Sequence, residues 1–170
     1  MSTFRRICHT FAAAALLALT AVSAAAADCN PAPDFLRAPV LSTQTSASKT
    51  IVGALGGVVQ VGRYTLLVPP GAIRGTAVVT VNVPDPAVMR CDLSISPASA
   101  NGFTVPVVLV ANVIGVTDLD PSSLATLWFD PQQGCWVTMP SSVFDAELQV
   151  LRTPLWHFSS YGTTGGRAGW

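Results

Sequence analysis

Val79-Thr80-Val81-Asn82-Val83 alternates strictly between apolar and polar side chains. Successive side chains of an extended chain point to opposite faces, so this stretch predicts a half-buried β-strand. No segment after residue 27 shows a sustained helical period with caps. Residues 93–96 repeat this alternation, and residues 107–111 are apolar on both faces, which predicts a central strand. Further strands are expected at 124–129, 135–139, 147–151 and 156–160.

Turn residues separate these expected strands. Asp130-Pro131-Gln132-Gln133-Gly134 stands between two of them and predicts a hairpin loop. From Thr50 on, short apolar runs alternate with Gly, Pro, Asn and Asp, which is typical of an all-β sandwich or barrel. We therefore predict one domain at residues 50–162, an antiparallel β-sandwich with short hairpins and about eight to ten strands.

The N-terminal 27 residues have the composition of a secretory signal peptide. Arg5 and Arg6 precede an apolar run at 11–22, and Ala25-Ala26-Ala27 supplies small residues for cleavage. The apolar run is shorter than the ~20 residues that span a bilayer, so we expect export to the periplasm or the cell exterior, with an uncleaved anchor as the alternative. Residues 28–49 are expected to form a flexible linker and residues 163–170 a loose tail.

The charge balance excludes some partners. Signal removal leaves 143 of the 170 residues, with seven basic and nine acidic side chains, a net charge of −2. This gives no basic patch for nucleic acid, and no membrane span or attraction to an anionic membrane is expected. No motif indicates a cofactor or a metal site. Asp118 and Asp120 are expected to cap a turn, because calcium takes about six to eight oxygen ligands.

The mature chain would keep three cysteines, Cys29, Cys91 and Cys135. In an oxidising compartment this odd number allows at most one internal disulfide and leaves one thiol. Cys91 and Cys135 both lie inside the expected domain and beside strands, so we expect them to form the disulfide. Three unpaired cysteines are the alternative.

Four segments of the expected domain have the order and spacing of a known family. They are Gly56-Gly57 followed by 64–73 with its Pro69-Pro70-Gly71-Ala72 turn, Ser96-Pro97 leading through Gly102-Phe103 to 106–109, Trp136, and His157-Phe158-Ser159 with Tyr161. Together they resemble the ZU-five domain of zonula occludens proteins, UNC-five netrin receptors and ankyrins. The resemblance spans residues 51–162 and implies an antiparallel sandwich used for intramolecular docking or protein contact. Unlike those relatives, this module contains cysteines, and we expect it to stand alone and to be exported.

Together with the expected signal peptide, the resemblance implies an exported, non-enzymatic module for protein–protein contact or scaffolding, whose partner it does not identify. An exposed sheet edge is one place where a partner could add a strand. A carbohydrate-binding module is the first alternative, because exposed aromatic side chains stack on sugars. The chain has four tryptophans. Those in expected strands, Trp128, Trp136 and Trp156, are expected to pack in the core, and Trp170 lies in the expected loose tail.

Self-cleavage is the second alternative, because some relatives of the ZU-five domain cut themselves between Phe and Ser of a His-Phe-Ser motif. Here Ser159 would attack the carbonyl carbon of Phe158, and His157 would move the proton. The competing interpretation is that Phe158 packs in the core while His157 and Ser159 form hydrogen bonds at a strand end.

Conventional catalysis is not expected, because His157 is the one histidine outside the signal and no hydrolase or metalloprotease motif occurs. Asp145 and Glu147 are close in sequence, but we expect them in a solvated turn rather than as a glycosidase pair.

Overall fold

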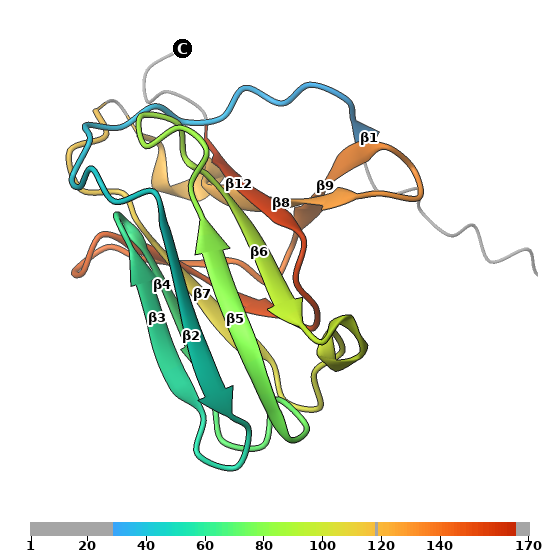
Figure 1. Ribbon diagram of the computed structural model, residues 1–170. Coiled ribbons are helices and arrows are strands. Elements are labelled where there is room, and N and C mark those ends of the chain that lie inside the picture. Colours follow the sequence, from blue (N-terminus) through green and yellow to red (C-terminus); the bar gives the residue numbers. More distant parts are fainter. Residues whose placement is uncertain (1–28, 118, 166–170) are drawn as a thin grey trace, which may run out of the picture.

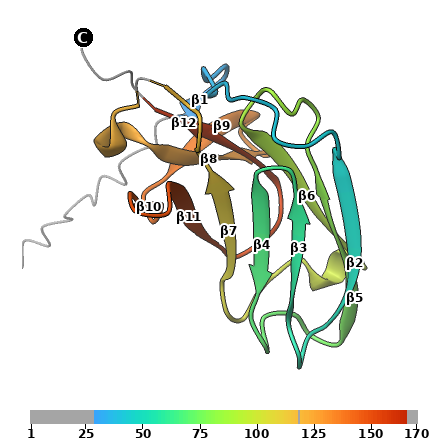
Figure 2. The ribbon, with the colours of Figure 1, turned by 90° about the vertical axis from the view of Figure 1, so that its left-hand side faces the viewer.

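The computed structural model describes residues 29–117 and 119–165, which form an antiparallel β-sandwich (Figures 1 and 2). This confirms the predicted fold class. The described residues contain twelve strands and two short 3₁₀ helices: β1 (Cys29–Asn30), β2 (Ser46–Val52), β3 (Gly57–Val61), β4 (Tyr64–Val68), β5 (Thr76–Asn82), β6 (Arg90–Ser96), η1 (Ala98–Ala100), β7 (Val107–Asn112), η2 (Pro121–Ser123), β8 (Ala125–Asp130), β9 (Cys135–Met139), β10 (Val143–Asp145), β11 (Val150–Leu155) and β12 (Ser160–Thr164). The predicted signal peptide lies outside them. No helix among them is long and apolar enough to cross a membrane.

The strands form two facing sheets. One has seven strands in the order β1-β9-β8-β12-β6-β5-β2, and the other has five in the order β10-β11-β7-β4-β3. Figure 2 shows β4 and β3 of the smaller sheet facing β6, β5 and β2 of the larger. As the alternation predicts, Val79 and Val81 of β5 are buried between the sheets, while Thr80 points outward. A buried hydroxyl pair, Thr126 and Thr153 at 2.6 Å, links the two sheets.

Two expected strands lie elsewhere than predicted. The strand expected at 147–151 is β11, which starts at Val150 after a turn. The strand expected at 156–160 is wrong, because these residues mainly carry the chain from the five-stranded sheet to the seven-stranded one. A chain that changes layers cannot stay in one ladder. The following strand, β12, begins at Ser160 and continues to Thr164, beyond the predicted domain end.

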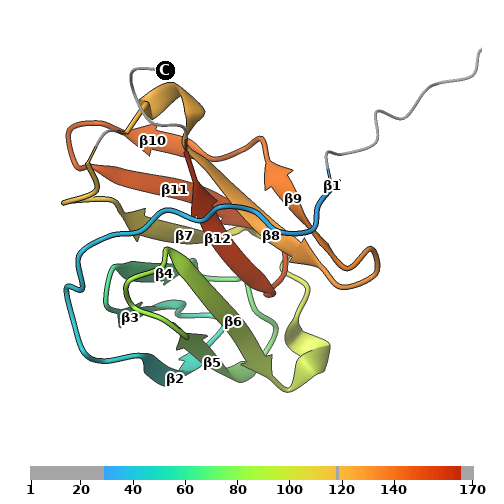
Figure 3. The same cartoon turned by 90° about the horizontal axis from the view of Figure 1, so that it is seen from above.

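Residues 29–45, which we call the strap, lie across the outer side of the seven-stranded sheet (Figure 3). Leu36 N–H donates to the Thr163 carbonyl at 2.9 Å, and Met89 N–H donates to the Leu36 carbonyl at 2.8 Å. The remainder of the expected linker enters β2 at Ser46. The predicted domain boundary at residue 50 is therefore too late, because the described fold already includes Cys29.

The outer faces of the two sheets differ in chemistry. On the five-stranded sheet, register and alternating burial bring apolar side chains into neighbouring outward positions; we call this set the apolar face: Val58, Leu67, Val108, Val110 and Pro154. The part of the seven-stranded sheet that the strap leaves open carries mainly hydroxyl groups; we call this set the hydroxyl face: Ser48, Thr50, Thr80, Ser94 and Ser96. The outer surface of the five-stranded sheet is therefore more apolar than the open part of the seven-stranded sheet.

Candidate functional site

A cleft of about 360 Å³ contains the His-Phe-Ser motif. Its walls come from the β11–β12 connection, the start of the β8–β9 hairpin, Asn101 after η1, and Trp128 of β8. These segments are distant in sequence. They meet because β12 pairs with β8 and because Asn101, which follows η1, bonds to the β11–β12 connection at Phe158. This is the place in the described fold where the predicted site residues come together.

Asn101 holds the peptide groups of Phe158 from both sides. Phe158 N–H donates to Asn101 Oδ1 at 2.6 Å, and Asn101 Nδ2 donates to the Phe158 carbonyl oxygen at 3.0 Å. The Phe158 ring is buried and packs edge-on against Phe103, with 4.7 Å between ring centroids. The side-chain amide therefore satisfies a backbone segment that lies in no ladder. Sequence reasoning missed Asn101, because it precedes the motif by 57 residues.

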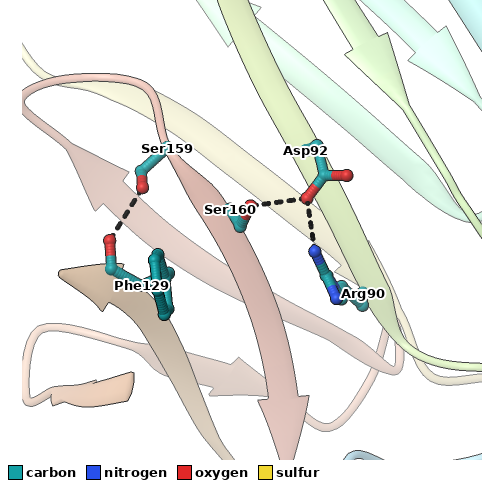
Figure 4. A network of polar contacts seen from close by, with 5 residues as sticks. All are labelled: Arg90, Asp92, Phe129, Ser159 and Ser160. Carbon is teal, nitrogen blue, oxygen red and sulfur yellow. Dashed lines mark hydrogen bonds and ion pairs between the residues drawn. The ribbon is translucent and has the colours of Figure 1, made fainter. Parts of the chain in front are cut away.

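The Ser159 hydroxyl is engaged by the backbone of a neighbouring strand. It donates to the Phe129 carbonyl oxygen of β8 at 2.8 Å. Figure 4 shows the adjacent Ser160 turned towards β6, where its hydroxyl donates to Asp92 Oδ1 at 2.6 Å. Arg90 pairs with the same carboxylate at 3.2 Å. The two serines thus tie β12 to both of its neighbours.

His157 contributes its ring to one contact and its carbonyl to another. The ring packs edge-on against Trp128, with centroids 4.9 Å apart. The carbonyl accepts a hydrogen bond from the Tyr161 hydroxyl at 2.7 Å. A tyrosine that bonds back to the backbone a few residues upstream is a known corner device of β-sandwiches. In the part of the chain that the structure describes, no hydrogen bond joins the His157 ring to the Ser159 hydroxyl, so their proposed base–nucleophile contact is not formed here.

Asp130 shapes the turn at the mouth of the cleft. Its carboxylate accepts the Gln132 N–H at 2.8 Å and the Gln133 side-chain amide at 2.9 Å. The backbone N–H of Gln132 is the main cause that lowers the pKa of this carboxyl, with a smaller effect from the charge of His157. Asp130 is therefore an anchor of the hairpin that the sequence predicts at 130–134.

The disulfide joins Cys29 to Cys135, with 5.6 Å between their Cα atoms. The predicted pairing of Cys91 with Cys135 is wrong. Cys91 points from β6 into the core, where burial raises the pKa of its thiol, whereas Cys135 lies at the start of β9 beside β1. The bond fixes the beginning of the strap to the sheet.

The strap covers an aromatic cluster on the outer side of the seven-stranded sheet. Phe35 packs edge-on against Trp136 at 4.8 Å, and Arg90 lies over the same indole at 5.4 Å. A Cβ on Gly162 would overlap the Phe35 ring, so the glycine allows this close approach. Phe35 was not predicted as a packing residue, because it lies in a proline-rich segment without a strand pattern.

Arg63 holds the other end of the strap. This buried guanidinium donates to the Asn112 carbonyl at 2.5 Å and to the Pro39 carbonyl. Burial lowers its pKa. The side chain thus joins the strap to the end of β7 through backbone carbonyls.

The other predicted sites remain separate. Asp120 caps η2 by accepting the Ser122 N–H and hydroxyl, while Asp118 lies outside the described residues. Asp145 accepts the Leu148 N–H at 3.0 Å and pairs with Arg152, and Glu147 is exposed. The described residues contain no group of three or more acidic, His or Cys side chains that could hold a metal.

The tryptophans differ in how far their side chains are exposed. Trp136 is buried beneath the strap, and Trp128 is half-buried against His157, as expected for tryptophans on strands. Trp156 was also expected on a strand, but it follows β11 and is 56% exposed. Trp170 lies outside the described residues. Trp156 is therefore the tryptophan within 29–117 and 119–165 that is most open to a ligand or partner.

Comparisons with known proteins add no relative. No protein-family model, no curated protein and no solved structure matches the chain.

Proposed function

We propose that this chain is an exported, non-enzymatic β-sandwich module, related to the ZU-five domain, that contacts another protein at the cell envelope or outside the cell. The apolar face is the observation that carries this proposal. An outward set of neighbouring valine, leucine and proline side chains favours association, because covering apolar surface removes it from water. The Cys29–Cys135 disulfide agrees with an oxidising compartment.

The sheet face is a better contact surface than the sheet edges. The edge strands β1 and β10 have two and three residues. Along the other side of the sandwich, Lys49 of β2 donates its ammonium group to the Val58 carbonyl of β3 at 3.2 Å. Charged lysines and short strands are features by which proteins discourage the addition of a foreign strand.

A matched pair of substitutions tests this proposal. Val58 is 44% exposed on the apolar face, and Val78 is 41% exposed on the outer side of the opposite sheet. We expect immobilised wild type and Val78→Lys to retain the same protein from envelope and extracellular fractions, and Val58→Lys to lose it. Equal retention by all three proteins would refute the role of the apolar face.

Self-cleavage at Phe158–Ser159 is a second candidate, favoured by one contact. The Asn101 amide donates to the Phe158 carbonyl oxygen, where negative charge would develop during attack by Ser159. In that reaction the acyl group moves from nitrogen to the Ser159 oxygen, the amide nitrogen takes a proton, and water hydrolyses the resulting ester. Intact mass spectrometry of wild type and Ser159→Ala decides the matter: a fragment of residues 159–170 from wild type alone supports cleavage, and intact chains from both exclude it.

A further inference from the structure

We infer that the protein seated on the apolar face is a second copy of this chain, related by a two-fold axis. This inference rests on the proposed function and names its partner. In a two-fold interface each subunit presents the same patch, so the patch must be complementary to itself in shape and in charge.

The charge of the face is balanced within one subunit. Arg152 of β11 and Asp145 of β10 form an ion pair at 3.7 Å, with their side chains 40% and 31% exposed. In register, Arg152 lies beside Val110 and Val143, and the other outward neighbours in this row are Gln60 and Thr65. The exposed Glu147 of the β10–β11 turn adds one negative charge at the margin of the face. A two-fold axis can place Arg152 of each subunit near the acidic side chains of the other. A strongly charged partner would find no matching field here.

The shape of the apolar face is set by side chains that protrude from the five-stranded sheet. Val58, Leu67, Val108 and Pro154 stand in one row across β3, β4, β7 and β11. Two such surfaces can pack about 10 Å apart with interdigitated side chains, which is the way sheets pack inside sandwiches. The pairing would repeat, between subunits, the contact that already holds the two layers of one subunit together.

The size of the face sets the expected strength. Five strands at ~4.8 Å spacing are ~19 Å wide, and a six-residue strand is ~20 Å long. The flat area is therefore about 400 Å² per subunit. This is below the ~800 Å² per partner of a standard stable complex. We accordingly expect a weak, reversible dimer rather than a permanent one.

The hydroxyl face does not compete for this role. Ser48 and Thr80 bond to each other across strands at 2.7 Å, and Ser160 bonds to Asp92. Polar groups that are already satisfied and hydrated gain little from burial against a copy. The strap crosses another part of that sheet (Figure 3).

Sedimentation of the purified protein from about 5 μM to about 500 μM tests the inference. We expect the average mass of wild type and of Val78→Lys to rise towards that of a dimer, and Val58→Lys to weaken association at least tenfold. Val143→Lys, at a site 64% exposed on β10, adds charge beside Arg152 without touching the core and should also weaken association.

Three results would overturn the inference: a monomer at every concentration, equal association of the Val58→Lys and Val78→Lys proteins, or association that Val143→Lys leaves unchanged. A monomeric wild type that still retains another protein in a Val58-dependent way would remove the dimer and keep the proposed function. Val58-independent capture would remove the proposed function. Matching thermal melts of the variants show that lost association does not reflect unfolding.

Discussion

Replacing Cys29 with Ser removes the one disulfide of the described chain, and the effect on stability can be estimated from the fold. The bond joins residues 106 positions apart. If disulfides act mainly by restricting the unfolded chain, a loop of about 100 residues is worth about 4.7 kcal/mol. Measured losses usually fall between about 2 and 5 kcal/mol. We expect Cys29→Ser to cost about 3 to 4 kcal/mol, which lowers the Tm by about 10 to 15 °C in a domain of this size.

Guanidinium unfolding, with and without a thiol reductant, measures this loss. Wild type should lose stability when reduced, and Cys29→Ser should match the reduced wild type in both buffers. An unchanged stability of Cys29→Ser under oxidising conditions would contradict the observed pairing, as would an equal effect of reductant on both proteins. Non-reducing peptide mapping then identifies the cysteine that Cys135 joins.

The same substitution should loosen the strap before the sandwich unfolds. Trp136 is 7% exposed beneath Phe35, and the disulfide holds the start of the strap beside it. Without the bond, local opening costs less, so acrylamide should quench Trp136 more strongly at temperatures far below the melt. Equal quenching in the oxidised and reduced proteins would show that packing alone fixes the strap.

Three further substitutions test single contacts. Gly162→Ala should cost about 1 to 3 kcal/mol in urea unfolding, because its methyl group displaces the Phe35 ring, and this cost should largely vanish in a Phe35→Ala background. Tyr161→Phe removes the hydrogen bond to the His157 carbonyl and should cost about 1 to 2 kcal/mol; no loss in a thermal melt would argue against the corner. Asp130 has a lowered pKa in the fold, so its contribution is present above its unfolded value and disappears as pH falls through the lower folded value. Asp130→Asn should therefore flatten the decline in stability below about pH 4, and parallel pH profiles would refute this.

The alternation of apolar and polar residues predicted the core strands, because successive side chains of a strand point to opposite faces of its sheet. Pro154 shows where this reasoning fails. A proline suggests that a strand ends before it, yet β11 continues to Leu155. The neighbouring β10 pairs only with residues 150–152, so Pro154 pairs with β7 alone. On its other side no strand requires the backbone N–H that proline lacks. Such one-sided pairing is a property of the assembled sheet.

The cysteine pairing and the strap were not predictable for a related reason. Both depend on contacts between residues more than a hundred positions apart, such as Phe35 with Trp136 and Cys29 with Cys135. Composition made residues 28–49 resemble a linker, because a Pro- and Ser-rich segment cannot bury a core of its own. It can still be ordered by a sheet that offers Gly162 and an indole to a single phenylalanine. The expected contact between His157 and Ser159 is absent from the described fold although they are two positions apart, because the Ser159 hydroxyl bonds to the Phe129 carbonyl and the His157 ring packs against Trp128.

The strap shields part of one side of the sandwich. Its start is fixed to β9 by the disulfide and its end continues into β2, both in the seven-stranded sheet, while Arg63 ties its Pro39 carbonyl to the end of β7 in the five-stranded sheet. It therefore covers the aromatic cluster of the seven-stranded sheet, where Phe35 packs against Trp136. On the outer side of that sheet Val78 is still 41% exposed, and on the apolar face of the other sheet Val58 is 44% exposed. Without the proposed second molecule, the row from Val58 to Pro154 stays hydrated at a cost that grows with every apolar residue added to it.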